Sequence, residues 1–386
     1  NMKNEIIRKI TSLTLMTIMF AGGMTLAIPG FLPDSAIPIQ AFAENSSTTE
    51  GMLTISSTEV QGAQVIELII DDPAISSIYV PHTNPTIDIL SGTTTSTLLM
   101  TQVVDGTWVA YMADLSTATD ADSGSLDFGT NCTTTLVVTE GWSDNGLSAF
   151  IENRGSNDND DVCDNPDEGS ATSTPMDVLQ NELDPISKGT SLNNNGVLTL
   201  GNAGHDTESW PTIFGVDFSS DNTATYGDDT IVFTFGPENA GTELIVNNGN
   251  PFVVQGQNLT ATIVDNGLNI DPTTAETWTF TAAGATARTT GATTDISANL
   301  GIYGFGTNGI LSVTDSDTAI CEDATSGCSG ISTYVFNETG VNTGVFEAHD
   351  SLGESVIDIK GDASVDQTVT IGYGGSSVMV TVATNN

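Results

Sequence analysis

The chain has 386 residues, with 49 aspartate and glutamate residues against 7 lysine and arginine residues, for a net charge of −42. So few basic side chains exclude nucleic-acid binding, which needs lysine and arginine against phosphate, and the excess of carboxylates excludes binding to anionic membrane surfaces. Folding with this self-repulsion requires strong screening or bound cations, which fits a saline surrounding.

Residues 1–43 have the pattern of a secretory signal. Lys3, Arg8 and Lys9 supply a positive start, an apolar run follows, and Ala41–Ala43 matches an A-x-A cleavage site. The alternative is a retained membrane anchor, but the apolar run is short and interrupted by glycine for a span of about 20 residues. We expect cleavage after residue 43, an extracellular location and no transmembrane segment in the mature chain.

The rest of the chain consists of short strand candidates separated by turn residues, and helix formers are scarce. The candidates are Met52–Ser56, Val65–Ile70, Leu98–Val104, Trp108–Met112, Thr134–Val138, Gly196–Leu200, Thr230–Phe235, Thr242–Val246, Leu259–Val264, Thr277–Thr281, Gly309–Val313, Ser332–Phe336, Val356–Ile359, Thr368–Tyr373 and Ser377–Val382. This pattern predicts an all-β fold of tandem immunoglobulin-like antiparallel β-sandwich domains. The one expected helix is Thr174–Leu183.

A linker-like run at Asn247–Pro251 divides the chain into two expected domains. Residues 44–247 are predicted to form β-sandwich domain 1, with an acidic insertion at 153–195. Residues 248–386 are predicted to form Ig-like β-sandwich domain 2. Each part is large enough to bury its own hydrophobic core.

The stretch Val254–Phe280 predicts a strand, an acidic turn and a second strand. Its turn ends at Pro272 and is crowded with Asp, Asn and Gly, which favour tight turns. Gln61–Asp72 and Gln255–Asn266 share a Gln-Gly opening, a hydrophobic strand and an acidic end. This similarity favours two domains of one kind, with chance likeness of two strands as the alternative.

Three clusters of oxygen-bearing side chains are candidate sites for Ca²⁺ or another divalent cation, since calcium takes six to eight oxygen ligands. The first cluster, within the insertion, is Asp158, Asp160, Asp161, Asp164, Asp167 and Glu168. The second is Asp265, Asn269 and Asp271, and the third is Asp315 and Asp317 with Glu322 and Asp323. The alternative for the first cluster is a solvated acidic loop.

Four cysteines, an even number in an exported chain, predict two disulfides. The simplest of the three possible connectivities joins Cys132 to Cys163 and Cys321 to Cys328. A zinc site is the competing interpretation, but no histidine lies near either pair. Four Asn-x-Ser/Thr sequons are candidate glycosylation sites: Asn45, Asn131, Asn258 and Asn337.

Signals for catalysis are weak. The three histidines are far apart in sequence, and no G-x-S-x-G, P-loop or H-E-x-x-H motif occurs. His205 and Asp206 near Trp210 form the one polar and aromatic cluster, which we interpret as structural. We therefore expect a protein that is not an enzyme.

Six segments in consistent order resemble the N-terminal part of the S-layer proteins of ammonia-oxidising archaea (Nitrososphaerota). They are Arg8–Gly30, Val103–Asp114, Asp120–Gly129, Ser209–Phe218, Ala261–Phe280 and Phe336–Glu347. Members of that family are several times longer, so the resemblance implies an N-terminal portion or a short form.

Together with the charge, this resemblance implies a structural protein of the cell surface that assembles with itself. Its lattice would be a porous, negatively charged envelope layer that binds and passes cations such as ammonium. The first alternative is a secreted or surface adhesin that binds a glycan or partner through sheet edges or loops. The second is a hydrolase on a sandwich scaffold.

Overall fold

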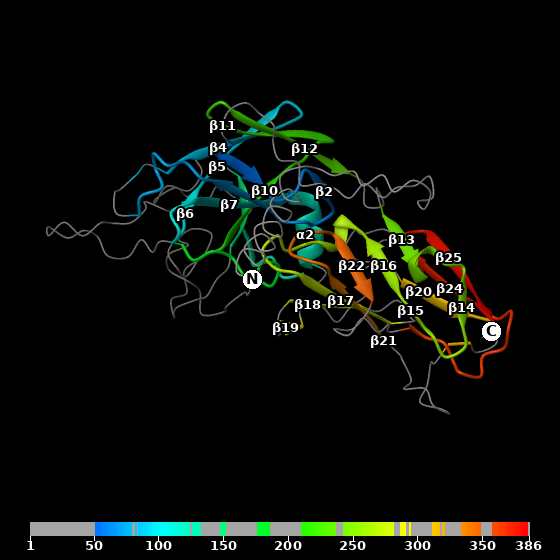
Figure 1. Ribbon diagram of the computed structural model, residues 1–386. Helices are drawn as coiled ribbons and strands as arrows, with labels where there is room; N and C mark the ends of the chain where they lie inside the picture. The colour runs from blue at the N-terminus through cyan, green and yellow to red at the C-terminus, as the bar shows by residue number, and fades with distance from the viewer. Residues whose placement is uncertain are drawn as a thin grey trace, which may run out of the picture. The chain divides into compact units, whose positions relative to one another are not determined.

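The computed structural model describes residues 51–78, 82, 84–123, 126–132, 147–151, 176–185, 210–236, 242–281, 286–290, 293–294, 311–316, 319–320, 333–348 and 357–384. They all belong to one compact unit that spans Glu50–Asn386 (Figure 1). The expected signal peptide lies outside the described residues. Of the described helices, none is long and apolar enough to cross a membrane.

The first sandwich contains two sheets, which we call sheet A and sheet B. Sheet A has the order β1 (Leu53–Ile55), β3 (Ile66–Ile70), β7 (Trp108–Asp114), β10 (Thr212–Val216), β9 (Ser148–Ile151) and β8 (Thr130–Cys132), with β6 (Thr101–Gln102) also paired to β7. Sheet B has the order β2 (Glu59–Gln61), β12 (Asp229–Gly236), β11 (Asp221–Tyr226), β4 (Thr86–Ser91) and β5 (Thr94–Leu99).

The two sheets pack face to face through one hydrophobic cluster. Alternating residues such as Leu68 of β3, Ile89 of β4 and Phe233 of β12 are fully buried in it. Sheet A is covered on its other face as well, because every residue of β7 and β10 is buried. A strand that is buried on both faces has no polar alternation, which is why Trp108–Asp114 is a continuous apolar run up to its last residue.

The second sandwich contains sheet C and sheet D. Sheet C has the order β13 (Glu243–Val246), β16 (Ala261–Val264), β22 (Val345–Ala348), β21 (Thr333–Glu338), β17 (Glu276–Thr281), β18 (Thr286–Thr290) and β19 (Thr293–Thr294). Sheet D has the order β14 (Phe252–Val254), β25 (Ser376–Ala383), β24 (Thr368–Tyr373) and β20 (Leu311–Asp315). A separate pair joins β15 (Asn258–Leu259) to β23 (Ile357–Asp358).

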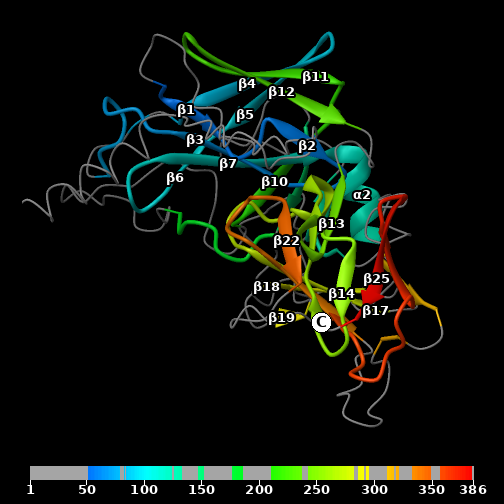
Figure 2. The same ribbon diagram turned by 45° about the vertical axis from the view of Figure 1, so that its right-hand side comes forward.

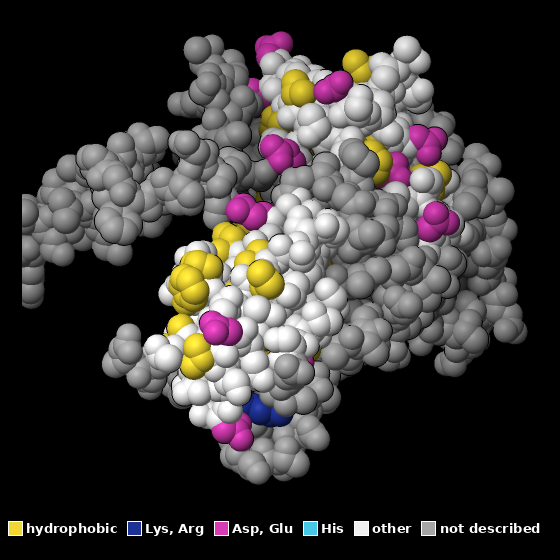
Figure 3. Space-filling model, turned by 90° about the vertical axis from the view of Figure 1, so that its right-hand side faces the viewer, with side chains coloured by type: hydrophobic (Ala, Val, Ile, Leu, Met, Phe, Trp, Pro, Cys, Tyr) yellow, Lys and Arg dark blue, Asp and Glu magenta, His cyan; other side chains and the backbone are white. Residues whose placement is uncertain are grey.

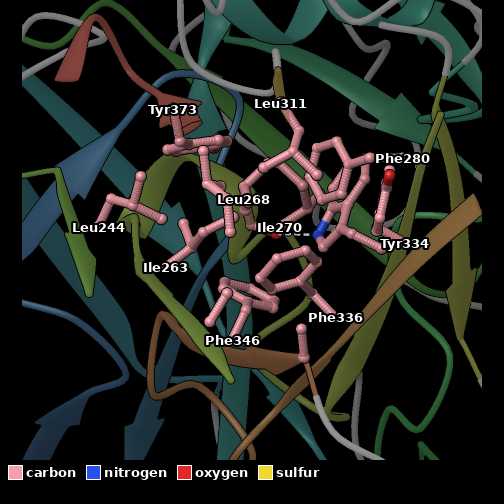
Figure 4. Packing of buried hydrophobic residues seen from close by; sticks show 14 of the residues in the cluster. Leu244, Ile263, Leu268, Ile270, Phe280, Leu311, Tyr334, Phe336, Phe346 and Tyr373 are labelled. Carbon is pink, nitrogen blue, oxygen red and sulfur yellow. Dashed lines mark hydrogen bonds between the residues drawn. The ribbon is translucent and has the colours of Figure 1, made fainter. Parts of the chain in front are cut away.

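Aromatic side chains fill the core of the second sandwich (Figure 4). The Phe280 ring meets Phe336 edge-on at a centroid distance of 5.6 Å and Tyr373 at 6.2 Å. Such edge-to-face pairs add about 0.5–1.5 kcal/mol each to the effect of burial. Buried Trp278 donates its indole N–H to the Leu268 carbonyl at 2.9 Å, so the core also fixes the short 3-10 helix η2 (Asn266–Leu268).

The predicted all-β sandwich fold is confirmed, whereas the immunoglobulin-like topology stays a prediction. Purely antiparallel pairing is wrong at three places, because β10 pairs with β7, β12 with β2, and β14 with β25 in parallel. In both sandwiches a short first strand therefore pairs in parallel with the last strand of its sheet.

The two sandwiches contain similar turns near the Gln-Gly sequences, offset by one residue relative to the sequence alignment. In the first, the Gln61 N–H donates to Gln64 Oε1 at 3.4 Å, and the Gln64 N–H donates back to the Gln61 carbonyl at 3.2 Å. In the second, the same two bonds join Val254 and Gln257, at 3.2 and 3.1 Å. A glycine with positive φ, Gly62 or Gly256, allows each turn. After each turn the chain crosses from one sheet to the opposite sheet.

The predicted helix at Thr174–Leu183 is wrong over the described residues 176–183, which are not helical. Met176 makes a β-bridge with Phe128, and the burial of Met176, Val178 and Leu179 holds the segment against the core. The helix lies instead at α2 (Leu115–Ser123), which covers sheet A. Its signal was the Asp114 N-cap, whose Oδ1 accepts the Thr117 N–H at 2.9 Å.

The predicted domain limits are not tested as a whole, but one strand lies on the other side of the expected boundary. Glu243–Val246 was assigned to the first domain, and as β13 it pairs with β16 in the second sandwich. The buried residues of the second sandwich also form one continuous cluster with the second face of sheet A.

Candidate functional site: the junction of the two sandwiches

Hydrogen bonds join the two sandwiches directly, and we call the residues that make them the junction. The Val65 N–H of the first sandwich donates to the Ile270 carbonyl of the second at 2.9 Å. Asn342 Nδ2 donates to the Ser56 carbonyl. Val65 and Ile270 are fully buried, so this contact belongs to the interior of the protein.

A second part of the junction is the extended segment 176–185 of the first half of the chain. The Gln180 N–H donates to Asp271 Oδ2 at 2.9 Å, and the Asn181 N–H donates to Thr273 Oγ1 at 3.1 Å. Asn266 Nδ2 adds a contact to the Glu59 carbonyl at 3.3 Å. The acidic turn at 265–273 therefore contacts three separate segments of the first half of the chain.

The carboxylates of this turn accept hydrogen bonds from main-chain N–H groups and from hydroxyl groups. Asp265 caps η2, since its Oδ1 accepts the Gly267 N–H at 2.8 Å, and its Oδ2 accepts the Tyr373 hydroxyl. Asp271 Oδ1 accepts the Thr273 N–H at 2.8 Å. Both aspartates are at most 1% exposed, so hydrogen bonds offset the cost of their burial.

Two buried glutamates that the sequence analysis did not single out complete the network. Glu276 Oε2 accepts the Ile270 N–H at 2.8 Å. Glu338 Oε1 accepts the Thr343 and Gly344 N–H groups at 2.6 and 2.9 Å, and its Oε2 accepts the Glu276 N–H at 3.1 Å. Both glutamates sit at strand ends, and a carboxylate beside a Gly-rich turn was the signal available in the sequence.

A carboxyl group of the first sandwich that interacts with the charge of Asp271 has a raised pKa. Half-buried Glu67 accepts the Tyr111 hydroxyl at 3.1 Å. Burial raises the Glu67 pKa to about 7; the Tyr111 hydrogen bond opposes this shift and the charge of Asp271 adds to it. Burial, together with the negative charge of Glu67, also raises the Tyr111 pKa well above its ordinary value.

The second predicted cation cluster lies within the junction, and its members contact different partners. Asn269 Nδ2 donates to Asn342 Oδ1 at 2.7 Å, while Asp265 and Asp271 accept the donors described above. Asn269 Oδ1 is buried without a hydrogen-bond partner. Cation binding at Asp265, Asn269 and Asp271 stays a prediction.

The other two cation clusters lie wholly or partly outside the described residues. Asp158, Asp160, Asp161, Asp164, Asp167 and Glu168 are all outside them, as are Asp317, Glu322 and Asp323. Asp315 Oδ2 accepts the Ile320 N–H at 2.8 Å. Within the described part of the chain, no group of three or more His, Cys, Asp or Glu residues could hold a metal ion.

The structure describes one of the four cysteines for which two disulfides were predicted. Cys132 ends β8, is 1% exposed and is disulfide-bonded. The other three cysteines, Cys163, Cys321 and Cys328, lie outside the described residues, so the partner of Cys132 is not identified. The pairing of Cys132 with Cys163 therefore stays a prediction.

We expect non-reducing peptide mapping to recover Cys132 linked to Cys163, and Cys321 linked to Cys328. Both links would close loops, and disulfides persist in exported proteins, which the expected signal peptide predicts this chain to be. The control is the same digest after reduction, in which both linked peptides disappear. A peptide linking Cys132 to Cys321 or Cys328 would contradict the pairing.

Three of the four predicted glycosylation sites are described, and they differ in access. Asn337 is exposed, although its Oδ1 accepts the Thr277 hydroxyl at 2.8 Å. Asn131 Nδ2 donates to Thr119 Oγ1 at 3.2 Å, and Asn258 lies half-buried in β15. Asn45 lies outside the described residues, and glycan occupancy at all four stays a prediction.

The cluster that sequence analysis interpreted as structural is visible only at Trp210, because His205 and Asp206 lie outside the described residues. Trp210 is 3% exposed, packs at 5.7 Å from the Tyr111 ring and donates its indole N–H to the Leu183 carbonyl at 3.0 Å.

No protein-family model matches the chain, and the comparison with curated proteins finds no match. The family resemblance stays a prediction.

Proposed function

We propose that this protein is a structural, non-enzymatic component of the cell surface that assembles with itself into an S-layer lattice. The observation that carries this proposal is the junction, in which the Asp271 carboxylate and the Ile270 carbonyl of the second sandwich accept the main-chain N–H groups of Gln180 and Val65 from the first half of the chain. Direct hydrogen bonds of this kind make a stiff building block, because each buried donor left unpaired would cost about 1–3 kcal/mol. A lattice needs such stiffness to repeat.

The charge gives the lattice its second property. After loss of residues 1–43, which hold three basic and two acidic residues, the chain keeps 4 basic and 47 acidic residues. Among the described residues, Asp265, Asp271, Glu276 and Glu338 are buried, and carboxylates at the surface set a negative potential that attracts cations. Pores lined with them pass small cations such as ammonium and delay anions. The location that follows is extracellular.

The direct test is assembly of the mature chain, residues 44–386. Purified protein at high concentration, with Ca²⁺ and about 0.5 M salt to screen its charge, is expected to form ordered sheets visible by electron microscopy. Permeation through these sheets is then compared for a small cation and an anion of equal size. Equal permeation at low salt removes the sieve, and a chain that stays monomeric in every condition contradicts the proposal.

Calcium is expected to raise the melting temperature of the mature chain by several degrees at fixed ionic strength, because an ion that binds only the folded state stabilises it by mass action. Replacing Asp158, Asp160, Asp161 and Asp164 by asparagine is expected to abolish this rise. The control replaces Asp362, an exposed carboxylate, by asparagine. If calcium and magnesium raised the melting temperature equally, the result would contradict a calcium-specific site. So would a melting temperature in calcium equal to that in a chelator.

A second candidate function is an adhesin, and one surface favours it. The outward face of sheet D presents Phe252 and Met379, 55% and 59% exposed, on the adjacent strands β14 and β25. Figure 3 views this side of the protein and shows several hydrophobic side chains gathered in one area, with an acidic side chain among them. Binding of a glycan array that is lost in Phe252→Ser would favour the adhesin over the lattice.

A further inference from the structure

Strand β5 is an edge of sheet B that lacks the usual protection against pairing. It has the sequence Thr-Thr-Ser-Thr-Leu-Leu, pairs with β4 over its full six residues without a bulge, and has no strand on its other side among the described residues (Figure 2). Natural edge strands are protected by charges, proline, bulges or short length. Strand β5 has none of these four devices.

The other sheet edges of the described chain are protected. Three of them, β1, β2 and β8, have only three residues. In the second sandwich, β13 begins with Glu243 and β20 ends with Asp315, while β14 has three residues and β19 has two. Among the described edges, β5 is therefore the longest strand without a charge.

The free side of β5 can be assigned residue by residue. The Met100 N–H donates to the Pro85 carbonyl at 3.0 Å, in continuation of the β4–β5 register. Hydrogen-bonded pairs alternate along an antiparallel ladder, so Leu98, Ser96 and Thr94 bond to β4. The N–H groups of Thr95, Thr97 and Leu99 therefore point away from the sheet.

We propose that the free edge of β5 pairs with the β5 edge of a second copy of this chain, antiparallel across a two-fold axis. This inference rests on the proposed function and names the contact that self-assembly would use. A two-fold contact places the same patch on both copies, and an unpaired strand edge complements itself in this way. Sheet B would then continue from one copy into the next.

The distribution of charge allows a second copy to bind at this edge. Two chains of −42 each repel wherever carboxylates face each other, so their contact must avoid carboxylates. On the outward face of β4 and β5 the one carboxylate is Asp88, which accepts the Thr97 hydroxyl at 2.6 Å. The strand itself carries no charge.

The core limits the register of this pairing. Ser96 and Leu98 point into the sandwich, with exposures of 8% and 0%. Residues directly opposite in an antiparallel pair share a face, so these two must meet residues of the same set in the partner. A slip by one residue would set the buried face of one copy opposite the exposed face of the other.

Salt is expected to promote this contact, because it screens the repulsion between two chains that each carry a large negative charge. The Asp88 carboxylates of two paired copies would lie three strand spacings apart, about 14 Å, which already exceeds the Debye length of about 8–10 Å at 0.1–0.15 M salt, so this pair adds little repulsion. One strand edge buries less than the roughly 1,200–2,000 Å² of a stable interface, so association in solution is weak. Many copies in a sheet would strengthen it.

The test is sedimentation velocity of the mature chain over a concentration series at about 0.1 M and about 1 M salt. We expect reversible association that strengthens with salt, and at least a tenfold loss of the association constant in both Thr95→Glu and Thr95→Lys. The lysine variant makes the net charge less negative, so a model of general charge repulsion would predict stronger association for it. Amides of Thr95, Thr97 and Leu99 should gain hydrogen-exchange protection with concentration.

The matched controls are Thr230→Glu and Thr230→Lys, on the exposed outward face of β12 in the same sheet. They should associate as the unchanged chain does. Loss of association in these controls, or association of both Thr95 variants at full strength, would overturn the edge contact while leaving lattice assembly intact. A chain that forms ordered sheets with its β5 amides unprotected would do the same. A chain that forms no sheets in any condition contradicts the proposed function itself.

Discussion

Replacing Glu338 by alanine is expected to lower the free energy of unfolding by about 3–5 kcal/mol, the range for a buried network that loses several hydrogen bonds. Glu338 is 7% exposed and accepts three main-chain N–H groups, from Thr343, Gly344 and Glu276. These donors stay buried when the carboxylate is removed. The loop that loses its acceptor also carries Asn342, which contacts the first sandwich.

The measurement is denaturant unfolding, together with hydrogen exchange at the Thr343 and Gly344 amides. Glu338→Gln keeps an acceptor for these two amides and turns its NH₂ toward the Glu276 N–H, so it should lose about half as much. Asp362→Ala removes an exposed carboxylate and should change stability by less than about 0.5 kcal/mol. Equal effects of Glu338→Ala and Asp362→Ala would contradict the structural role of Glu338.

Raising the pH from about 5 to about 8 is expected to destabilise the protein through Glu67. The folded protein holds the Glu67 proton up to a pKa of about 7, whereas the ordinary value is 4.5. Between these values the folded state binds more protons than the unfolded state, so stability falls as pH rises. The loss is on the order of 2–3 kcal/mol after allowance for the partial exposure of the side chain.

Glu67→Gln is expected to flatten this pH dependence and to stabilise the protein above pH 7, because the amide stays neutral and its oxygen still accepts the Tyr111 hydroxyl. Melting temperatures are compared for both proteins across this pH range. Glu338, Asp122, Asp127 and Asp358 also have raised pKa values, so a smaller slope of the same sign remains in the variant. Identical slopes in both proteins would contradict the role of Glu67.

Strands rich in apolar residues could mostly be predicted from the sequence: Val65–Ile70 and Thr230–Phe235 lie in β3 and β12. Strand β4 was missed although its residues alternate between buried and exposed. Asp221–Tyr226 (β11) was missed, because Ala224 is its one buried hydrophobic residue. Its pairing with β4 and β12 holds it in the sheet. Thr212–Val216 is buried on both faces, so it has no alternation to detect.

The site was predicted in part for a different physical reason. A crowd of Asp and Asn around Asp265–Asp271 predicted a turn, which the structure confirms as η2 with its Asp265 cap. The same residues were interpreted as cation ligands, because sequence does not reveal which donor meets each oxygen. Glu276 and Glu338 lie 62 positions apart and meet only once β17 and β21 pair.

The parallel pairing of first and last strands has a mechanical consequence. Sheet D of the second sandwich begins with β14 and ends with β25, which lie side by side with Phe252 opposite Thr381 and Val254 opposite Ala383. When the two ends of such a pair are pulled apart, the force runs along the strands, and its hydrogen bonds bear the load together. The same arrangement joins β2 to β12 in the first sandwich. In both sheets, force applied to the first and the last strand would therefore load the parallel pair in shear.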